Sequence, residues 1–154
     1  MLLPPKGNIL TKGFCWGEDN CRLDDESRLC FHKENVKRLS DHDVVELYRC
    51  PDPTGVRFLL CPPKNWKILA AAIEQHFARS QELDEAMRLW CSGTPVGIDN
   101  QGRIRITAIC LNHAKLGPGT RARVLGVGYY YEVSQLQQFS INSYSKYGQI
   151  SGPT

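Results

Sequence analysis

The chain has 154 residues, of which 42% are hydrophobic and 23% are charged, and its formal net charge is +3. These values are typical of a globular domain and exclude a largely disordered chain. No apolar run approaches the length of a membrane span, and the opening MLLPPKGNILTKG lacks the basic start and long apolar core of a signal peptide. We therefore expect a cytoplasmic protein without membrane association.

The first half of the chain alternates short apolar segments with turns. In chain order we predict a flexible leader at 1–13, a strand at 14–22, a turn at 24–27, a strand at 28–31, a helix at 32–39, a strand at 44–50, a turn at 51–55 and a strand at 56–61. Leu29 and Phe31 alternate with polar neighbours, as in a half-buried strand. The segment PDPTG has proline and glycine at its two ends, which favours a turn.

Two helices are predicted in the middle of the chain. The segment 62–79 begins with prolines, which suit a helix start, and a second helix follows at 81–91. Apolar residues recur at helical spacing in both segments: Trp66, Leu69, Ile73, Phe77, Leu83, Met87 and Trp90. Such stripes are typical of packing between helices and the core.

The second half repeats the order of the first. A strand, a turn and a strand surround IDNQGRIRI at 98–106, followed by a helix at 106–116, strands at 120–128 and 129–133, a short helix at 134–139 and a flexible polar tail at 140–154. Asp24 corresponds to Asp99, and Arg28 to Arg103, at an offset of 75 residues. The sequence therefore predicts an α+β, β-rich domain of two similar halves, 14–79 and 92–139, with pseudo-two-fold symmetry.

The repeated turn is the most informative motif. In the second half, Asp99 can accept backbone N–H bonds, and Gly102 allows the positive φ of a tight turn. If Ile104 faces the core, Arg103 and Arg105 point outward together, and their planar guanidinium groups suit phosphate or the guanine edge. In the first half, Asp24, Ser27 and Arg28 take the corresponding positions.

The two halves differ in charge. Residues 100–131 contain no acid and five cations, whereas residues 14–63 contain ten acids and seven Lys or Arg residues. Glu26 in the first turn would repel phosphate, because DNA affinity depends on neutralising the backbone. The acidic turn could instead contact the basic half of a second copy, head to tail.

This arrangement resembles the MraZ family of the SpoVT-AbrB swapped-hairpin superfamily. The resemblance covers residues 14–139 and rests on the repeated Asp-x-x-small-Arg turn, the tryptophan-led helix after FLLCPPKNW and the helical pair between the halves. It implies duplicated swapped-hairpin halves, a ring of identical subunits and binding to repeated boxes of double-stranded DNA in the promoter of the division and cell-wall gene cluster, on the nucleoid. The residues expected to contact DNA are Arg103, Arg105, Arg28, Lys115 and Arg121. Gln101 and Glu26 stand where the family has lysine, and the proline that usually follows is replaced by His32 and Thr107.

Two other functions stay open. One is an oligomeric, ring-forming interaction protein on the same fold with weakened or lost DNA binding, which the acidic first turn favours. The other is an enzyme, although the chain lacks the common hydrolase, zinc-protease and phosphate-loop motifs. Seven cysteines show no Cys-x-x-Cys spacing, and Cys30 with His32 is the one close Cys/His pair. We therefore predict no catalytic residue, no metal site and no cofactor.

Overall fold

The computed structural model describes residues 1–4 and 15–136 and has an α+β architecture dominated by one antiparallel sheet. The strands are β1 (Glu18–Leu23), β2 (Arg28–Cys30), β3 (Glu46–Pro51), β4 (Phe58–Cys61), β5 (Thr94–Gly97), β6 (Arg103–Arg105), β7 (Arg121–Gly126) and β8 (Tyr131–Gln135). They follow the order β5-β3-β4-β8-β7-β1-β2-β6. The strands predicted from alternating apolar residues are thus confirmed, with boundaries shifted by a few residues.

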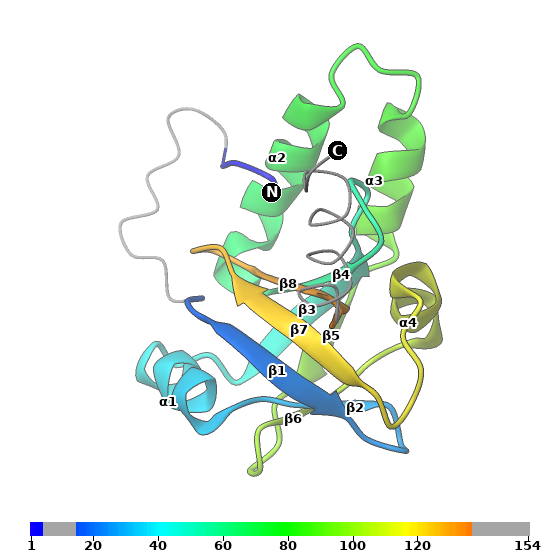
Figure 1. The fold of residues 1–154 in the computed structure, drawn as a ribbon. Helices are drawn as coiled ribbons and strands as arrows, with labels where there is room; N and C mark the ends of the chain where they lie inside the picture. Colours follow the sequence, from blue (N-terminus) through cyan, green and yellow to red (C-terminus); the bar gives the residue numbers. More distant parts are fainter. Residues whose placement is uncertain (5–14, 137–154) are drawn as a thin grey trace, which may run out of the picture.

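The sheet curls into a nearly closed barrel (Figure 1). Its two edge strands, β5 and β6, are consecutive in the chain and lie next to each other. A guanidinium nitrogen of Arg49 on β3 donates a hydrogen bond to the backbone oxygen of Arg105 on β6, across this seam. The seam between β5 and β6 is therefore held by a side chain together with the turn that joins the two strands.

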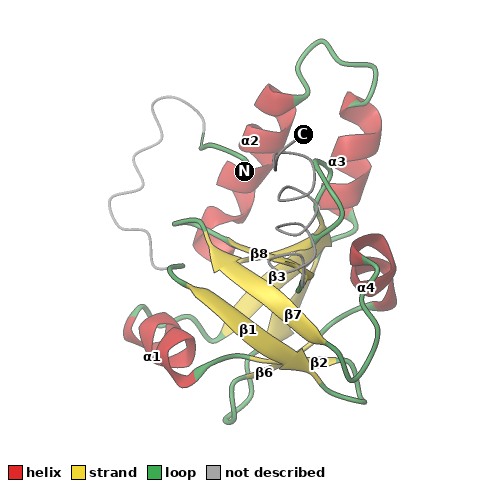
Figure 2. Ribbon diagram, in the orientation of Figure 1, coloured by secondary structure: helices red, strands yellow, loops and turns green. Residues whose placement is uncertain are grey.

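In the residues that the structure describes, four α-helices surround the sheet, and Figure 2 shows how they are arranged around it. They are α1 (Lys33–Asp41), α2 (Trp66–His76), α3 (Leu83–Cys91) and α4 (Ala108–Ala114), and a short 3-10 turn (Pro63–Asn65) precedes α2. All four were predicted, and the apolar stripes of α2 and α3 do pack into a core. None of the helices in the described part of the chain is long and apolar enough to cross a membrane.

Two apolar cores hold the elements together. The first fills the barrel and includes Leu29, Ile104 and Ile106, so the isoleucines of the second motif face inward as expected. The second lies between the sheet and α2 with α3. In it Trp66 stacks on Trp90, with ring centroids 4.8 Å apart.

The start of the chain belongs to this second core, which corrects the predicted leader. Leu2 is 1% exposed. Its backbone nitrogen donates to the hydroxyl of Tyr130 at 2.7 Å, and its carbonyl accepts from the hydroxyl of Tyr129 at 2.7 Å. No local sequence pattern predicts these contacts, because the partners lie more than 120 positions away. Residues 5–13 lie outside the described residues.

Leu2→Ala is expected to lower the free energy of unfolding by about 2 kcal/mol, because it removes a fully buried side chain at a chain end that can partly relax. The matched control is Leu3→Ala, since Leu3 is 71% exposed. Urea unfolding of both variants measures the difference. Equal stability of the two would show that Leu2 is not held in the core.

Other boundaries at the end of the chain also differ from the prediction. Ser134 and Gln135 belong to β8 rather than to a short helix. The Tyr129–Tyr131 run was predicted as part of that strand, but β8 begins only at Tyr131. The rest of the predicted helix at 134–139, from residue 137, and the predicted tail at 140–154 lie outside the described residues.

Strand pairing repeats at the same offset as the sequence. β2 and β6, α1 and α4, and β3 and β7 each begin 75 positions apart. Leu29, the central residue of β2, pairs with Ile104, the central residue of β6. These two residues are equivalent positions of the repeat, so β2 and β6 pair symmetrically. The pairing of β1 with β7 and that of β5 with β3 are equivalent in register under this offset.

Candidate nucleic-acid interface

The first repeated turn is built by one carboxylate. Oδ1 of Asp24 accepts hydrogen bonds from the backbone nitrogens of Glu26 and Arg28, both at 2.9 Å. Its Oδ2 accepts from Nε of Arg28 at 2.8 Å. The same aspartate thus shapes the turn and orients the arginine, as the sequence predicted for the backbone bonds.

The second turn has the same geometry. Oδ1 of Asp99 accepts from the backbone nitrogens of Gln101 at 2.9 Å and Arg103 at 2.8 Å. Its Oδ2 accepts from Nε of Arg103 at 2.7 Å. The repeat therefore extends from the sequence frame to individual hydrogen bonds.

The two arginines differ in how far they are neutralised. Arg28 also lies 3.5 Å from the carboxylate of Glu26, through Nη2. Gln101 takes the place of Glu26 in the second turn, and Asp99 is the one carboxylate within ion-pair distance of Arg103 among the described residues. The terminal nitrogens of Arg103 are therefore better placed to bind an external anion.

In both turns the residue before the arginine has a left-handed backbone conformation. Gly102 has φ 76°, and Ser27 has φ 61°. Left-handed backbone costs a residue with a Cβ about 1–2 kcal/mol, which glycine avoids. A Cβ at Gly102 would also lie 2.5 Å from Cγ2 of Val36.

Opposite effects on stability are therefore expected at these equivalent positions. Gly102→Ala should lower the free energy of unfolding by about 2 kcal/mol through backbone strain and the clash with Val36. Ser27→Gly should raise it by about 0.5 kcal/mol, since relief of strain is partly offset by the entropy of glycine. Thermal melts of the two variants test this, and a change of the same sign at both positions would contradict it.

The turn carboxylates also make stability depend on pH. The backbone hydrogen bond from Arg28 chiefly holds the pKa of Asp24 below its ordinary value, and that from Arg103 does the same for the pKa of Asp99. A carboxyl whose pKa is lowered in the folded state stabilises the fold above its unfolded pKa, and this stability is lost as the pH falls through the folded pKa.

Wild type should therefore lose thermal stability below about pH 4, near the unfolded pKa of aspartate. The double variant Asp24→Asn/Asp99→Asn should lose less over the same range, although it starts lower at pH 7. Melting temperatures between pH 7 and pH 2 measure the effect. Asp25→Asn serves as the control, and parallel curves for the double variant and wild type would contradict the prediction.

Pairing of β2 with β6 brings the motif arginines together. Arg28 pairs with Arg105, and Cys30 with Arg103. Arg28, Arg103 and Arg105 line a pocket of about 330 Å³ together with Arg49, Val96, Gly97 and Asp99, and we call this pocket the basic groove. Four arginines face one aspartate there, so the groove attracts anions.

The sequence did not indicate Arg49 as a site residue. It reaches the groove from β3, where its Nε donates to Oγ1 of Thr94 at 3.2 Å. Burial lowers the pKa of the Arg49 guanidinium, and nearby Arg105 lowers it further. Crowding of like charges is relieved when an anion enters, which is a property expected of an anion site.

A second pocket is the counterpart of the basic groove in the first half. It encloses about 280 Å³, and we call it the acidic groove; its lining residues are Arg22, Asp24, Asp25, Glu26, Arg28 and Cys30. Three carboxylates face two arginines here. The charge difference between the halves therefore becomes a difference between two adjacent grooves that share Arg28.

The other two predicted DNA contacts lie apart from the basic groove. Lys115 follows α4 with φ 55° and lines neither groove. Arg121 begins β7, where it pairs with Arg22 of β1. The structure thus brings three of the five predicted residues together and leaves two outside.

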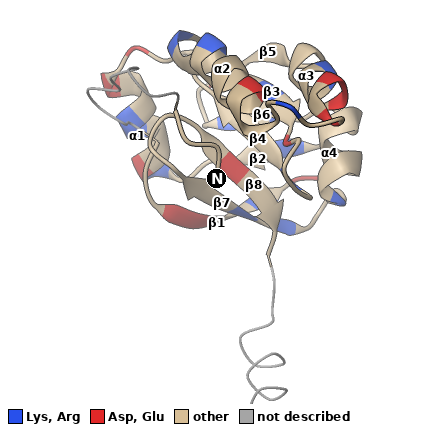
Figure 3. Cartoon of the chain, turned by 90° about the horizontal axis from the view of Figure 1, so that it is seen from above, with Lys and Arg blue, Asp and Glu red and all other residues tan. Residues whose placement is uncertain are grey.

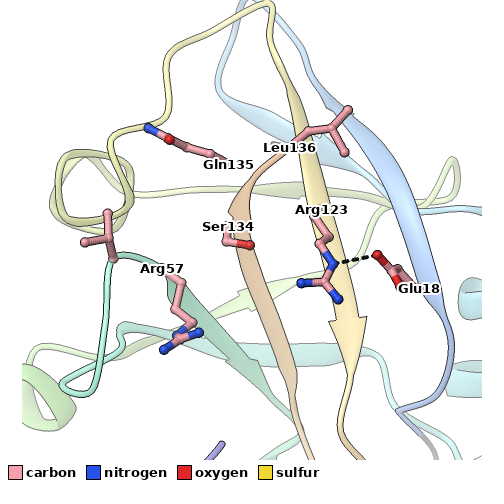
Figure 4. Close-up of a pocket in the computed structure, with 7 residues that line it drawn as sticks. Glu18, Arg57, Arg123, Ser134, Gln135 and Leu136 are labelled. Carbon is pink, nitrogen blue, oxygen red and sulfur yellow. Dashed lines mark hydrogen bonds and ion pairs between the residues drawn. The ribbon is translucent and has the colours of Figure 1, made fainter. Parts of the chain in front are cut away.

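Another pocket, of about 480 Å³, lies beside β7 and β8 (Figure 4). Its two arginines are already paired: Arg123 donates to Glu18 at 2.6 Å, and Arg57 to Asp52 at 2.6 Å. The pocket is therefore less suited to an anion than the basic groove. Charges of both signs are also mixed on α1, α2 and α3 (Figure 3).

The five buried cysteines in the described part of the chain are poorly suited to a reactive centre. Burial raises the pKa of the Cys21 thiol to about 11 and also raises the pKa of Cys15, Cys50, Cys61 and Cys110. Such thiols stay protonated at neutral pH and are poor nucleophiles. Within residues 1–4 and 15–136, no three His, Cys, Asp or Glu side chains are grouped so that they could hold a metal ion.

Comparison with known proteins does not place the chain in a family. No family model matches the sequence. A search of curated proteins likewise finds no match.

Proposed function

We propose that this protein is a sequence-specific DNA-binding regulator of the MraZ type. The observation that carries the proposal is the basic groove, where the arginines of two equivalent turns meet across β2 and β6. A guanidinium group can donate two parallel hydrogen bonds to a phosphate or to the edge of a guanine. A groove with three more cations than anions also favours binding of a polyanion.

We also propose that the two halves of the chain are copies of one swapped hairpin. Two features support it. The hairpin β1–β2 pairs with β7 and β6 of the second half, while β5 pairs with β3 of the first half. The equivalent registers under an offset of 75 residues are what duplication of one half would produce.

In this proposal, Arg103 and Arg105 are the main DNA contacts and Arg28 is a weaker one. Arg28 is weaker because Asp24 and Glu26 already bind its guanidinium. By resemblance, the target would be repeated boxes in a promoter of division and cell-wall genes, bound on the nucleoid by a ring of subunits.

Fluorescence anisotropy tests the proposal. Labelled duplex from upstream of the protein's own gene, and a scrambled duplex of equal composition, are titrated with full-length protein at two salt concentrations. We expect tighter binding to the native duplex and a marked loss of affinity at high salt, since phosphate contacts release counterions. Equal affinity for both duplexes would overturn sequence-specific binding.

The acidic groove favours a second candidate, an oligomer built by contact between acidic and basic grooves of neighbouring copies. Head-to-tail contacts of this kind close rings. The variant Asp25→Lys/Glu26→Lys should then reduce the molar mass in light scattering, with Arg88→Ala as the control. An unchanged mass would reject this contact.

A further inference from the structure

Strand register places arginines in a row across the outside of the barrel. Arg121 on β7 is opposite Arg22 on β1, Arg22 is opposite Cys30 on β2, and Cys30 is opposite Arg103 on β6. Directly opposed residues of antiparallel strands point to the same face. That face is the outer one, because the intervening residues Leu23, Leu29, Ile104 and Ala122 are buried.

Three of the four positions in the row carry a cation, and the uncharged Cys30 lies between Arg22 and Arg103. Arg22 and Arg121 are both exposed. Among the described residues, neither has a carboxylate within ion-pair distance, unlike Arg103, which Asp99 holds. Two like charges directly opposite each other destabilise a sheet, so an anion between Arg22 and Arg121 would relieve the repulsion.

The acidic turn lies beside this row and not within it. Arg28 pairs with Arg105 one step closer to the turn, and the carboxylates of Asp24 and Glu26 hold Arg28 there. A phosphate chain that followed Arg28 would meet these carboxylates. One that follows Arg22 runs further from the turn, along the side of the acidic groove that Arg22 and Cys30 line.

We infer that DNA crosses the strands along this row, with its phosphates bound by Arg121, Arg22 and Arg103 in turn. The inference rests on the proposed function and adds Arg22, which no sequence motif indicated. Three inter-strand spacings of roughly 4.8 Å give a row of about 14 Å, the axial length of about four nucleotides at 3.4 Å each. The acidic turn of the first half bounds the path by repulsion.

Cys30 offers a gain-of-charge test within the row. Its thiol is half-buried, on the outer face between Arg22 and Arg103. Its equivalent in the second half, 75 positions later, is Arg105, so this strand position accepts an arginine. Cys30→Arg would place a further cation in the middle of the proposed phosphate path.

The experiment measures the salt dependence of binding to the native duplex. Each phosphate contact contributes about 0.9 to the slope of log K against log salt. We expect Arg22→Ala/Arg121→Ala to reduce the slope by about 1.8 and Cys30→Arg to increase it by about 0.9. Arg88→Ala, which changes an exposed side chain of α3, should leave it unchanged, and circular dichroism confirms that each variant is folded.

The outcomes separate the two proposals. A slope unchanged in both Arg22→Ala/Arg121→Ala and Cys30→Arg, while Arg103→Ala still weakens binding, would overturn the path across β1 and β7 and leave the basic groove as the site. Failure of wild type to bind duplex DNA at any salt concentration would overturn the proposed function, and the path with it.

Discussion

Replacing Arg103 with alanine is expected to weaken binding to the native duplex at least tenfold, whereas Arg28→Ala should have a smaller effect. The reason is local: Asp99 orients Arg103 and leaves its terminal nitrogens available, while Glu26 also neutralises Arg28. A bidentate contact between arginine and guanine contributes about 1–3 kcal/mol of discrimination, and 1.4 kcal/mol is a factor of ten.

Anisotropy titrations against native and scrambled duplexes distinguish two roles for Arg103. If it reads bases, the variant loses preference for the native duplex. If it binds phosphate alone, affinity for both duplexes falls together. Equal losses in Arg28→Ala and Arg103→Ala would show that the two turns contribute alike, contrary to the prediction.

The largest expected effect on stability comes from a third aspartate turn, between β3 and β4. Asp52 is fully buried. Its carboxylate accepts bonds from the backbone nitrogen and hydroxyl of Thr54 at 2.8 and 2.7 Å, and from Nε of Arg57 at 2.6 Å. Nε2 of His113 on α4 lies 2.7 Å from the backbone oxygen of Asp52, which ties the helix to the turn.

Asp52→Ala should therefore lower the free energy of unfolding by about 3 kcal/mol, because it leaves two donors of Thr54 without a partner and leaves the half-buried cation of Arg57 with only the more distant carboxylate of Glu132, at 4.0 Å. Asp24→Ala is the matched control on an exposed turn and should lose less. Urea denaturation compares the two. Similar losses would mean that burial of Asp52 adds nothing to the strength of the turn.

Local chemistry made the repeated turns predictable. Aspartate followed by a small residue and arginine predicts backbone bonds to the carboxylate and a left-handed position, and the structure has both at Asp99 and Gly102. The Asp52 turn was recognised as a turn, but its ion pair was missed because Arg57 follows Asp52 by five positions instead of four.

Other features depend on contacts between distant positions and have no local signal. Leu2 is held by Tyr129 and Tyr130. In the sequence these two belong to a run of three tyrosines, which predicts an ordinary strand. Arg22 lies opposite Arg121, and Arg49 contacts Arg105, because of how the strands pair. The sequence does not specify this strand register. A one-residue shift in that register would turn these side chains to the opposite face, so composition and spacing could not place them.

The interleaved pairing also determines when the chain can fold. β1 pairs with β2 on one side, but its partner on the other side is β7, where Arg22 lies opposite a residue 99 positions later, Arg121. At a synthesis rate of about 5–20 residues per second, the hairpin β1–β2 waits roughly 5–20 seconds for that strand. During this time its apolar face is not covered and its strand edges are not paired, which favours aggregation. Folding must therefore follow synthesis and proceed slowly, because four of the seven strand pairings in the described residues join distant segments.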